Sequence, residues 1–212
     1  MSFHFPVDIA HTKANNEYYR DARRLIVSSG IFSALLIIGA ALMILFLDRT
    51  PLVLGGAMVV LAIAILYIGV TFQVRRSIKP PQELYDSSPL VPAVVAEVNE
   101  RTMVLMTLVD IRRDFTVGKP KRALALRTVT TVSGVPRRVG ARIPAIAVAG
   151  AHKSGTEFYD EVTPVPIAWA TRDKSVIAKA SRQIAHDDWT LLESNIKRVD
   201  DVRATKRDLL LL

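Results

Sequence analysis

Two long apolar runs stand out in the first third of the sequence. They extend from Leu25 to Leu47 and from Leu52 to Val74, and neither contains Asp, Glu, Lys, Arg or His. Each run reaches the roughly 20 residues that a helix needs to cross a bilayer core. Core helices of soluble proteins are usually shorter and carry polar residues. A cleaved signal peptide fits poorly, because a long polar segment comes first and a second run follows at once. We therefore predict two transmembrane helices that persist in the mature chain.

Residues 48–51 separate the two runs, so the helices should form a tight hairpin. Pro51 suits the first position of the second helix, where the N–H that it lacks would be unpaired. Basic residues lie mainly at the outer ends of the hairpin, and the turn carries only Arg49. The outer residues are Lys13, Arg20, Arg23 and Arg24 before the first run and Arg75, Arg76 and Lys79 after the second. Because positive residues stay inside, both termini are predicted to be cytoplasmic, with the chain in the cell membrane.

The ends of the hairpin also predict contacts with lipid. Tyr18 and Tyr19 lie beside the arginines that precede the first run, as in an interfacial belt whose guanidinium groups meet anionic lipid phosphates. Within the runs, small residues allow close helix packing. These residues are Ser29, Gly30, Ser33, Ala34, Gly55 and Gly56. Contact between the two helices explains them more simply than contact with a partner's helix. Ion pathways through a membrane need ionisable groups, and the two runs have none. We therefore interpret the hairpin as an anchor or as a packing surface for a larger assembly.

The N-terminal arm, residues 1–24, begins with Phe3, Phe5 and Val7. Such a short apolar stretch is either disordered or buried against something, and we expect a partner to bind it. Asn15 or Asn16 would cap a helix that continues into the membrane.

A second unit, residues 83–212, follows a basic, proline-containing linker at 75–82. Its first part is rich in Val, Leu and Thr and is divided by turn residues, which predicts five short strands in a small barrel or curled sheet. The predicted strands are Val91–Val98, Thr102–Val109, Arg122–Val132, Arg142–Val148 and Glu157–Val162. Pro144 would require its strand to be an edge strand or to contain a bulge.

Helical spacing replaces this pattern towards the C-terminus. It predicts one helix from about Asp173 to Ala185 and a second helix capped near Asp187, with Trp189, Leu192, Ile196 and Val199 on one face. Strands followed by helices indicate an α+β domain. We expect the terminal residues Leu209–Leu212 to dock on the domain, the membrane or a partner. The predicted fold is thus a transmembrane helical hairpin joined to a cytoplasmic α+β domain.

Charge and composition exclude several functions. The chain of 212 residues has a formal net charge of +8 and no cysteine. Without Cys there is no disulfide framework, thiolate metal site or cysteine nucleophile. Residues 83–212 contain 20 basic and 16 acidic residues, which is too balanced for a nucleic-acid footprint. We therefore expect no nucleic-acid partner.

Catalytic patterns are scarce. None of the four histidines shows the spacing of a known metal motif, and no serine lies in a nucleophile-elbow pattern. We predict no cofactor, no metal and no catalytic residue. A site assembled from distant positions stays open as an alternative, with His152, Lys153, Asp160 and Trp169 as its candidate residues.

Three segments carry a resemblance to a known family: Asn15-Asn16-Glu17 to Arg23-Arg24, the strand from Gly140 to Gly150, and Thr163-Pro164-Val165-Pro166 to Trp169. Together with the architecture, they resemble an actinobacterial family of small two-span membrane proteins whose cytoplasmic domain has no assigned function. In size and shape the chain also resembles accessory subunits of the actinobacterial respiratory supercomplex of cytochrome bcc and cytochrome aa3 oxidase. No haem or copper ligand pattern accompanies that likeness.

Two functional hypotheses follow. The first is a noncatalytic accessory or adaptor subunit whose partners are an integral membrane protein complex and anionic lipids. The second is a membrane-tethered enzyme or small-ligand sensor with its site in the strand domain. A deep pocket with convergent polar groups would favour the second.

Overall fold

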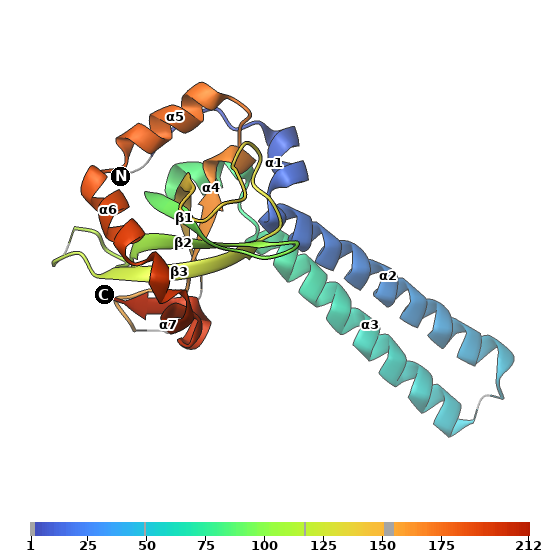
Figure 1. Cartoon of the computed structure of the whole chain (residues 1–212). Helices are drawn as coiled ribbons and strands as arrows, with labels where there is room; N and C mark the ends of the chain where they lie inside the picture. Colours follow the sequence, from blue (N-terminus) through green and yellow to red (C-terminus); the bar gives the residue numbers. More distant parts are fainter. Residues whose placement is uncertain (1–2, 49, 117, 151–154) are drawn as a thin grey trace. The chain divides into compact units, whose positions relative to one another are not determined.

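The computed structural model describes residues 3–48, 50–116, 118–150 and 155–212 (Figure 1). It divides the chain into two compact units. One is a helical hairpin, Glu17–Lys79, and the other combines Met1–Asn16 with Pro80–Leu212.

The hairpin consists of α2, Glu17–Phe46, and α3, Pro51–Ser77, which lie side by side (Figure 1). Both helices are long and apolar enough to cross a membrane. Thr50 caps α3, since its hydroxyl accepts the Val53 N–H at 3.3 Å, and Pro51 is the first helical residue as predicted. The first long helix also begins where predicted, directly after Asn16.

The other unit contains two short helices that the sequence pattern did not reveal. The first, α1, Ile9–Asn15, precedes the hairpin and is capped by Asp8, whose carboxylate accepts the His11 N–H. The second, α4, Pro81–Ser87, follows it. The expected linker at 75–82 is therefore largely helical, and only residues 78–80 connect α3 to α4.

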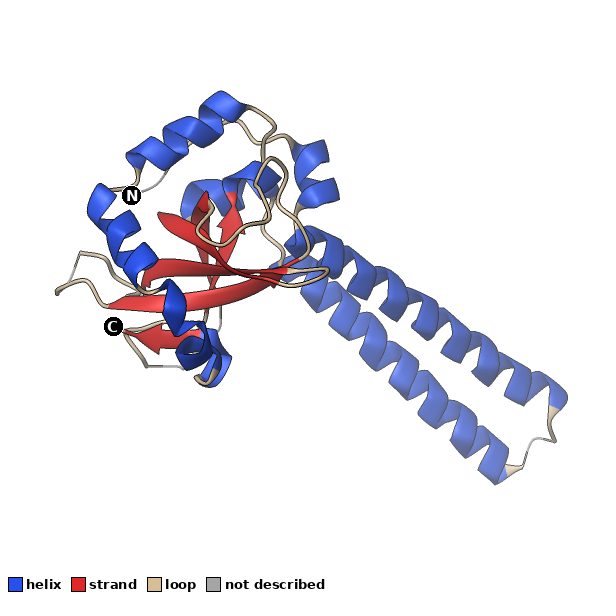
Figure 2. Cartoon of the chain, viewed as in Figure 1, coloured by secondary structure: helices blue, strands red, loops and turns tan. Residues whose placement is uncertain are grey.

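The core of this unit is a curled antiparallel sheet of six strands in the order β5-β4-β1-β2-β3-β6, with helices outside it (Figure 2). The strands are β1 Leu90–Val98, β2 Met103–Asp110, β3 Arg122–Val129, β4 Arg142–Ala149, β5 Val162–Pro166 and β6 Leu209–Leu211. Both faces are buried, since neighbouring residues such as Leu105 and Met106 are both inaccessible. Strands buried on both faces read as continuous apolar runs, which explains the weak alternation in the sequence.

Helices cover the outer face of the sheet. They are α5 Lys174–Gln183, α6 His186–Ser194 and α7 Val199–Arg203, with short 3₁₀ turns η1 Ile167–Trp169, η2 Ile196–Arg198 and η3 Lys206–Asp208. Trp189, Leu192 and Val202 pack against Val94 and Met106 of the sheet. The first of the two predicted helices begins close to the expected position, and Asp173 caps it by accepting the Ser175 N–H.

The second predicted helix differs from the observed one. Its cap position is Ala185 rather than a residue near Asp187, and it ends at Ser194. Asn195 interrupts the continuous pattern, because its side chain turns back to the Leu191 carbonyl at 2.7 Å. Ile196 and Val199 consequently lie in separate short elements, η2 and α7.

The curl brings β5 close to β3, although the two are not paired. Arg127 of β3 donates to the Pro164 carbonyl of β5 at 3.1 Å. The sheet is therefore curled rather than a closed barrel. Leu209–Leu211 adds the unpredicted sixth strand on the free edge of β3, so the leucine tail docks on the domain, one of the three expected locations.

Two further strand predictions were wrong. The fifth strand begins at Val162 instead of ending there, so the proline-containing segment to Pro166 is itself the strand. Pro144 lies in β4, an interior strand. It is tolerated there because it faces Pro92 between the hydrogen-bonded positions of β1 and β4, and its nitrogen points past the end of β5.

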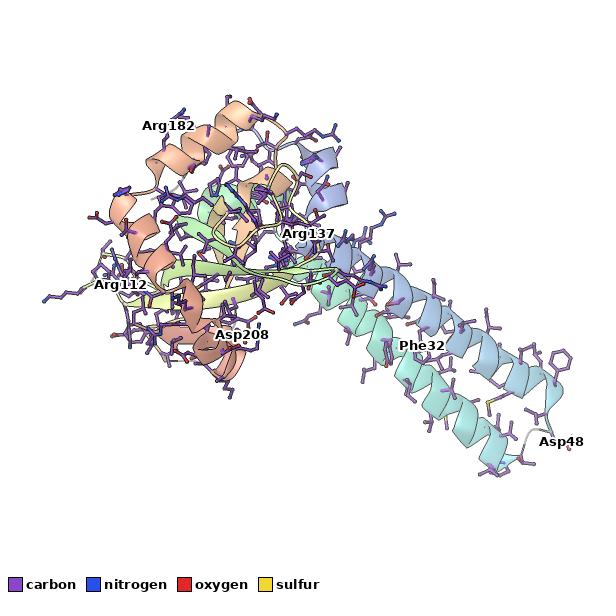
Figure 3. The ribbon with its side chains drawn as sticks, viewed as in Figure 1. Phe32, Asp48, Arg112, Arg137, Arg182 and Asp208 are labelled. Atoms are coloured by element: carbon purple, nitrogen blue, oxygen red, sulfur yellow. The ribbon has the colours of Figure 1, made fainter. Side chains whose placement is uncertain are left out.

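The sheet has two ends with different connections. The β1–β2 turn and the β3–β4 loop, which contains Arg137, lie at one end. The β2–β3 and β4–β5 loops, with Arg112, lie at the other (Figure 3).

Candidate functional site

The N-terminal arm packs onto the domain that follows the hairpin. The Phe5 ring lies 5.4 Å from that of Phe3 and 5.7 Å from that of Tyr85, between ring centroids. Val7 donates its N–H to Gln82, whose amide in turn donates to the Phe5 carbonyl at 2.9 Å. Phe3 and Phe5 are buried and Val7 is half-buried. The three residues that the sequence assigned to a partner are thus held by the chain itself.

Buried polar contacts secure the same junction. The His11 imidazole Nε2 hydrogen bonds to the Ala168 carbonyl at 3.0 Å. The Asn16 amide donates to the Tyr85 hydroxyl, which donates to the Pro166 carbonyl at 3.1 Å. Such buried groups are costly to leave unpaired, so these bonds fix the segment before the hairpin to the segments after it.

A cleft of about 800 Å³ opens between the β2–β3 and β4–β5 loops. Its lining residues are Arg112, Arg113, Asp114, Gly118, Lys119, Gly155, Thr156, Glu157, Phe158 and Tyr159. The two loops are joined across the opening, because Arg113 donates its N–H to the Glu157 carbonyl and Tyr159 donates to Ile111. Sequence reasoning missed these residues. The signal in the sequence that could have revealed them is the cluster of cations at 112–122, between the second and third predicted strands.

Arg112 lines the cleft and is held in place by several hydrogen bonds. Its guanidinium binds the Asp110 carboxylate through Nε and Nη2, at 2.6 Å for the shortest contact, and donates to the Gly118 carbonyl at 2.7 Å. Burial alone would raise the pKa of Asp110, but hydrogen bonds from Arg112 and from the Lys121 N–H outweigh it and lower the pKa. The charge of Arg112 is thereby balanced by that of Asp110. The bond to the Gly118 carbonyl ties the guanidinium to the β2–β3 loop.

The remaining charges at the cleft are of both signs. Arg113, Lys119, Asp114 and Glu157 all line it. Hydrogen bonds from the Thr116 hydroxyl and N–H lower the pKa of Asp114, so this carboxylate is ionised at neutral pH and suits charge recognition rather than proton transfer. Within the described residues, no group of three His, Cys, Asp or Glu could hold a metal ion.

The two described residues of the alternative catalytic set, Asp160 and Trp169, lie at opposite ends of the sheet. Asp160 lies in the loop before β5, at the cleft end, where it pairs with Arg207 at 3.6 Å. Trp169 follows β5 at the other end of the sheet, buried, with its indole N–H donating to the Thr131 carbonyl and Arg127 over its ring. His152 and Lys153 lie outside the described residues.

The small residues of the hairpin occupy two different environments. Ser29 and Ser33 are buried, and a Cβ on Gly56 would approach the Met43 methyl to 3.2 Å. A Cβ on Gly30 or Gly55 would meet nothing within 4 Å. Gly30, Ser33 and Ala34 instead line a mainly apolar groove of about 340 Å³ between the helices, with Ile37, Ile68, Thr71, Phe72 and Arg75.

The predicted interfacial residues gather at the open end of the hairpin. The Tyr19 hydroxyl donates to the Lys79 carbonyl at 2.9 Å, which ties the start of α2 to the end of α3, and the Tyr18 and Tyr19 rings pack edge to face. Arg20 pairs with Glu17 at 3.4 Å, Arg24 pairs with Asp21 at 3.7 Å, and Arg76 lies over the Phe72 ring. Arg23 and Arg75 are exposed.

Comparisons with known proteins support the membrane assignment without naming an activity. Residues 76–200 match a family described as a protein of unknown function, DUF3239. A solved structure of a candidate membrane protein from Corynebacterium diphtheriae is 48% identical, with a TM-score of 0.56. The match covers 58% of this chain and 100% of the other. A search of curated proteins finds no match. The expected likeness to an actinobacterial family without assigned function is therefore confirmed in these terms.

Proposed function

We propose that this chain, which belongs to the DUF3239 family of proteins of unknown function, is a noncatalytic accessory or adaptor subunit of a larger membrane protein complex. The hairpin would anchor it in the cell membrane, and the α+β domain would present a binding surface in the cytoplasm.

One observation carries this proposal: the segments on both sides of the hairpin fold into a single domain. Residues 1–16 and 80–212 form one compact unit. Only Asn16 separates α1 from α2, and only residues 78–80 separate α3 from α4. Both ends of a membrane hairpin would thus be fixed to one body on one side of the bilayer. The excess of cations at those ends favours the cytoplasmic side. Such a domain is held by two short connections, as suits an adaptor.

The groove of the hairpin supports a contact with another membrane protein. Gly30 and Ala34 leave room for a close approach, and the groove is mainly apolar. In lipid, close van der Waals packing at small residues is a main source of helix association. An apolar helix of an integral membrane complex is the occupant that fits. The respiratory supercomplex of cytochrome bcc and cytochrome aa3 oxidase is the specific partner that we propose to test first.

The test is native mass spectrometry of the tagged protein, extracted gently from its own membrane. We expect stoichiometric copurification of a large complex, and a Gly30→Leu variant that fills the groove should lose most of it. Gly55→Leu is the matched control, since a Cβ on Gly55 also meets nothing within 4 Å and Gly55 lies outside the groove. Equal membrane abundance of the two variants would show that insertion is intact. A mass spectrum that shows only a monomer or a homo-oligomer of this chain would contradict the proposal.

The cleft between the β2–β3 and β4–β5 loops favours a second candidate, a small-ligand sensor. Its volume of about 800 Å³ and its charges of both signs suit a polar ligand. A thermal-shift screen of the full chain tests this function. A ligand whose effect is lost in Arg113→Ala would support it, and a response unchanged in that variant would count against this cleft.

A further inference from the structure

The end of the sheet opposite the cleft carries two loops that Arg137 joins into one body. Its guanidinium donates to the carbonyls of Asn99 at 2.7 Å, Glu100 at 3.2 Å and Thr102 at 3.3 Å in the β1–β2 turn. It also donates to Thr130 at the start of the β3–β4 loop. We call residues 98–102 and 130–141 the Arg137 tip. Because one side chain bridges both loops, the tip presents a fixed surface.

The surface of the tip combines cations with apolar side chains. Val139 is 56% exposed, and Val98 is also exposed. Arg101 and Arg138, close to these valines in the sequence, are exposed as well, and among the described residues neither side chain has an ion-pair or hydrogen-bond partner. Glu100 is the only acidic residue in the tip. Exposed valines flanked by unpaired guanidinium groups match a surface of anionic lipid headgroups, where phosphate meets the cations and the interface takes up the apolar groups.

The tip lies at the same end of the domain as the residue from which the hairpin departs. Asn16 contacts Tyr85, and Tyr85 contacts Pro166 at the end of β5. From the 3₁₀ turn that follows, Trp169 donates to Thr131 of the tip. A continuous series of contacts within the domain thus joins the start of α2 to the β3–β4 loop.

The connections to the hairpin are too short for the domain to move far from a membrane. Three residues, 78–80, follow α3, and an extended chain of that length spans about 10 Å. At the start of the hairpin, Asn16 alone separates α1 from α2. If the hairpin crosses the bilayer, Asn16 itself stays near the headgroups, because it directly precedes α2.

We infer that the Arg137 tip is a second membrane-contact surface, in which Arg101 and Arg138 bind anionic lipid phosphates and Val139 enters the headgroup region. This inference rests on the proposed membrane anchoring by the hairpin. It adds a contact of the domain itself with the bilayer.

The absence of cysteine makes a clean labelling experiment possible. Val139→Cys, labelled with an environment-sensitive fluorophore, is placed in the full chain in nanodiscs of phosphatidylcholine with or without phosphatidylglycerol. We expect a blue-shifted emission and at least twofold stronger quenching by headgroup-located quenchers when the anionic lipid is present. Phe115→Cys is the matched control, because Phe115 is 50% exposed in a cation-rich loop at the opposite end of the sheet. Its emission should not respond.

Two further variants separate the possible failures. The double variant Arg101→Gln/Arg138→Gln should abolish the lipid response of the Val139 label. A label on Leu66→Cys reports on the hairpin and should be quenched by quenchers in the acyl region in every case. If Leu66 is quenched but Val139 is not, the inference is overturned while anchoring stands. If Leu66 is not quenched, the anchoring itself is wrong. If the Val139 label responds only when a copurified protein is present, the tip binds a partner instead of lipid.

Discussion

The hairpin and the domain use apolar residues in opposite ways. In α3, Leu66 is 65% exposed, and the outward positions of both long helices are similarly open. In β2, Leu105 is completely buried, as are nearly all of its neighbours along the strand. The domain follows the rule for a protein folded in water, where apolar surface is removed from solvent. The hairpin would break that rule unless its solvent is a lipid bilayer.

Small residues show the same contrast. In the hairpin, Ser29, Ser33, Ala57 and Ala64 are among the buried side chains, and the large ones point outward. In the domain, the buried set includes Trp169, Tyr85 and Met103. A membrane helix pair gains little from burying leucine against leucine, since lipid is as apolar as leucine itself, and close backbone approach is favoured instead. The distribution of residue sizes therefore distinguishes the two environments, independently of the total apolar content.

The largest expected effect comes from making the same substitution in both regions. Leu105→Ala should destabilise the domain by about 3 kcal/mol, because it leaves a cavity in a closed core. Leu66→Ala should change domain stability by less than about 0.5 kcal/mol. Both tryptophans lie in the domain, so urea unfolding followed by their fluorescence in detergent measures this difference. An equally large loss in Leu66→Ala would show that the outward face of α3 is buried in an assembly needed for stability.

The next effect reverses the comparison by adding a charge to the hairpin. Leu66→Arg places a guanidinium near the middle of α3 and should reduce insertion by about 3 kcal/mol. The measurement is the fraction of protein that resists carbonate extraction from membranes. Leu52→Arg is the control, because Leu52 lies in the first turn of α3, where a long side chain can reach the headgroups. Equal behaviour of the two variants would argue against a spanning helix.

The elements with strong patterns could be predicted from the sequence, and the rest could not for identifiable reasons. Local rules account for the two long helices, for Pro51 at the start of α3 and for a helix that begins near Asp173. The bounds of β5 were predicted wrongly because prolines such as Pro164 and Pro166 usually break strands. They are acceptable here only because β5 lies at the edge of the sheet. Strand β6 has three residues, too few for a periodic signal, and it depends on the partner edge of β3.

The candidate sites were harder to predict because they depend on tertiary contacts. The burial of Phe3 and Phe5 requires Tyr85, which is distant in sequence and lies beyond the hairpin. The cleft needs the β2–β3 and β4–β5 loops to meet, and the sequence alone shows only a cluster of cations in the first. Asp160 and Trp169 are close in sequence, yet β5 separates them to opposite ends of the sheet.

The smallest effect concerns protons, which should weaken the domain and have no carboxylate to act on in the charge-free spans of the hairpin. The pKa of Asp110 in the folded chain lies below its ordinary value of 3.8, since Arg112 and Lys121 outweigh the effect of burial. As pH falls, the unfolded state therefore takes up the proton first. The stability that Asp110 contributes is complete above about pH 4 and is lost as pH falls through its folded pKa.

Asp110→Asn should be less stable than the parent at pH 6, and the two should converge in acid. Urea unfolding at pH 6 and pH 3 measures this convergence, whereas the charge-free spans of α2 and α3 contain no carboxylate through which acid could weaken them. A constant difference at both pH values would show that Asp110 acts through its shape and neutral hydrogen bonds, and the contrast with the hairpin would then rest on packing alone.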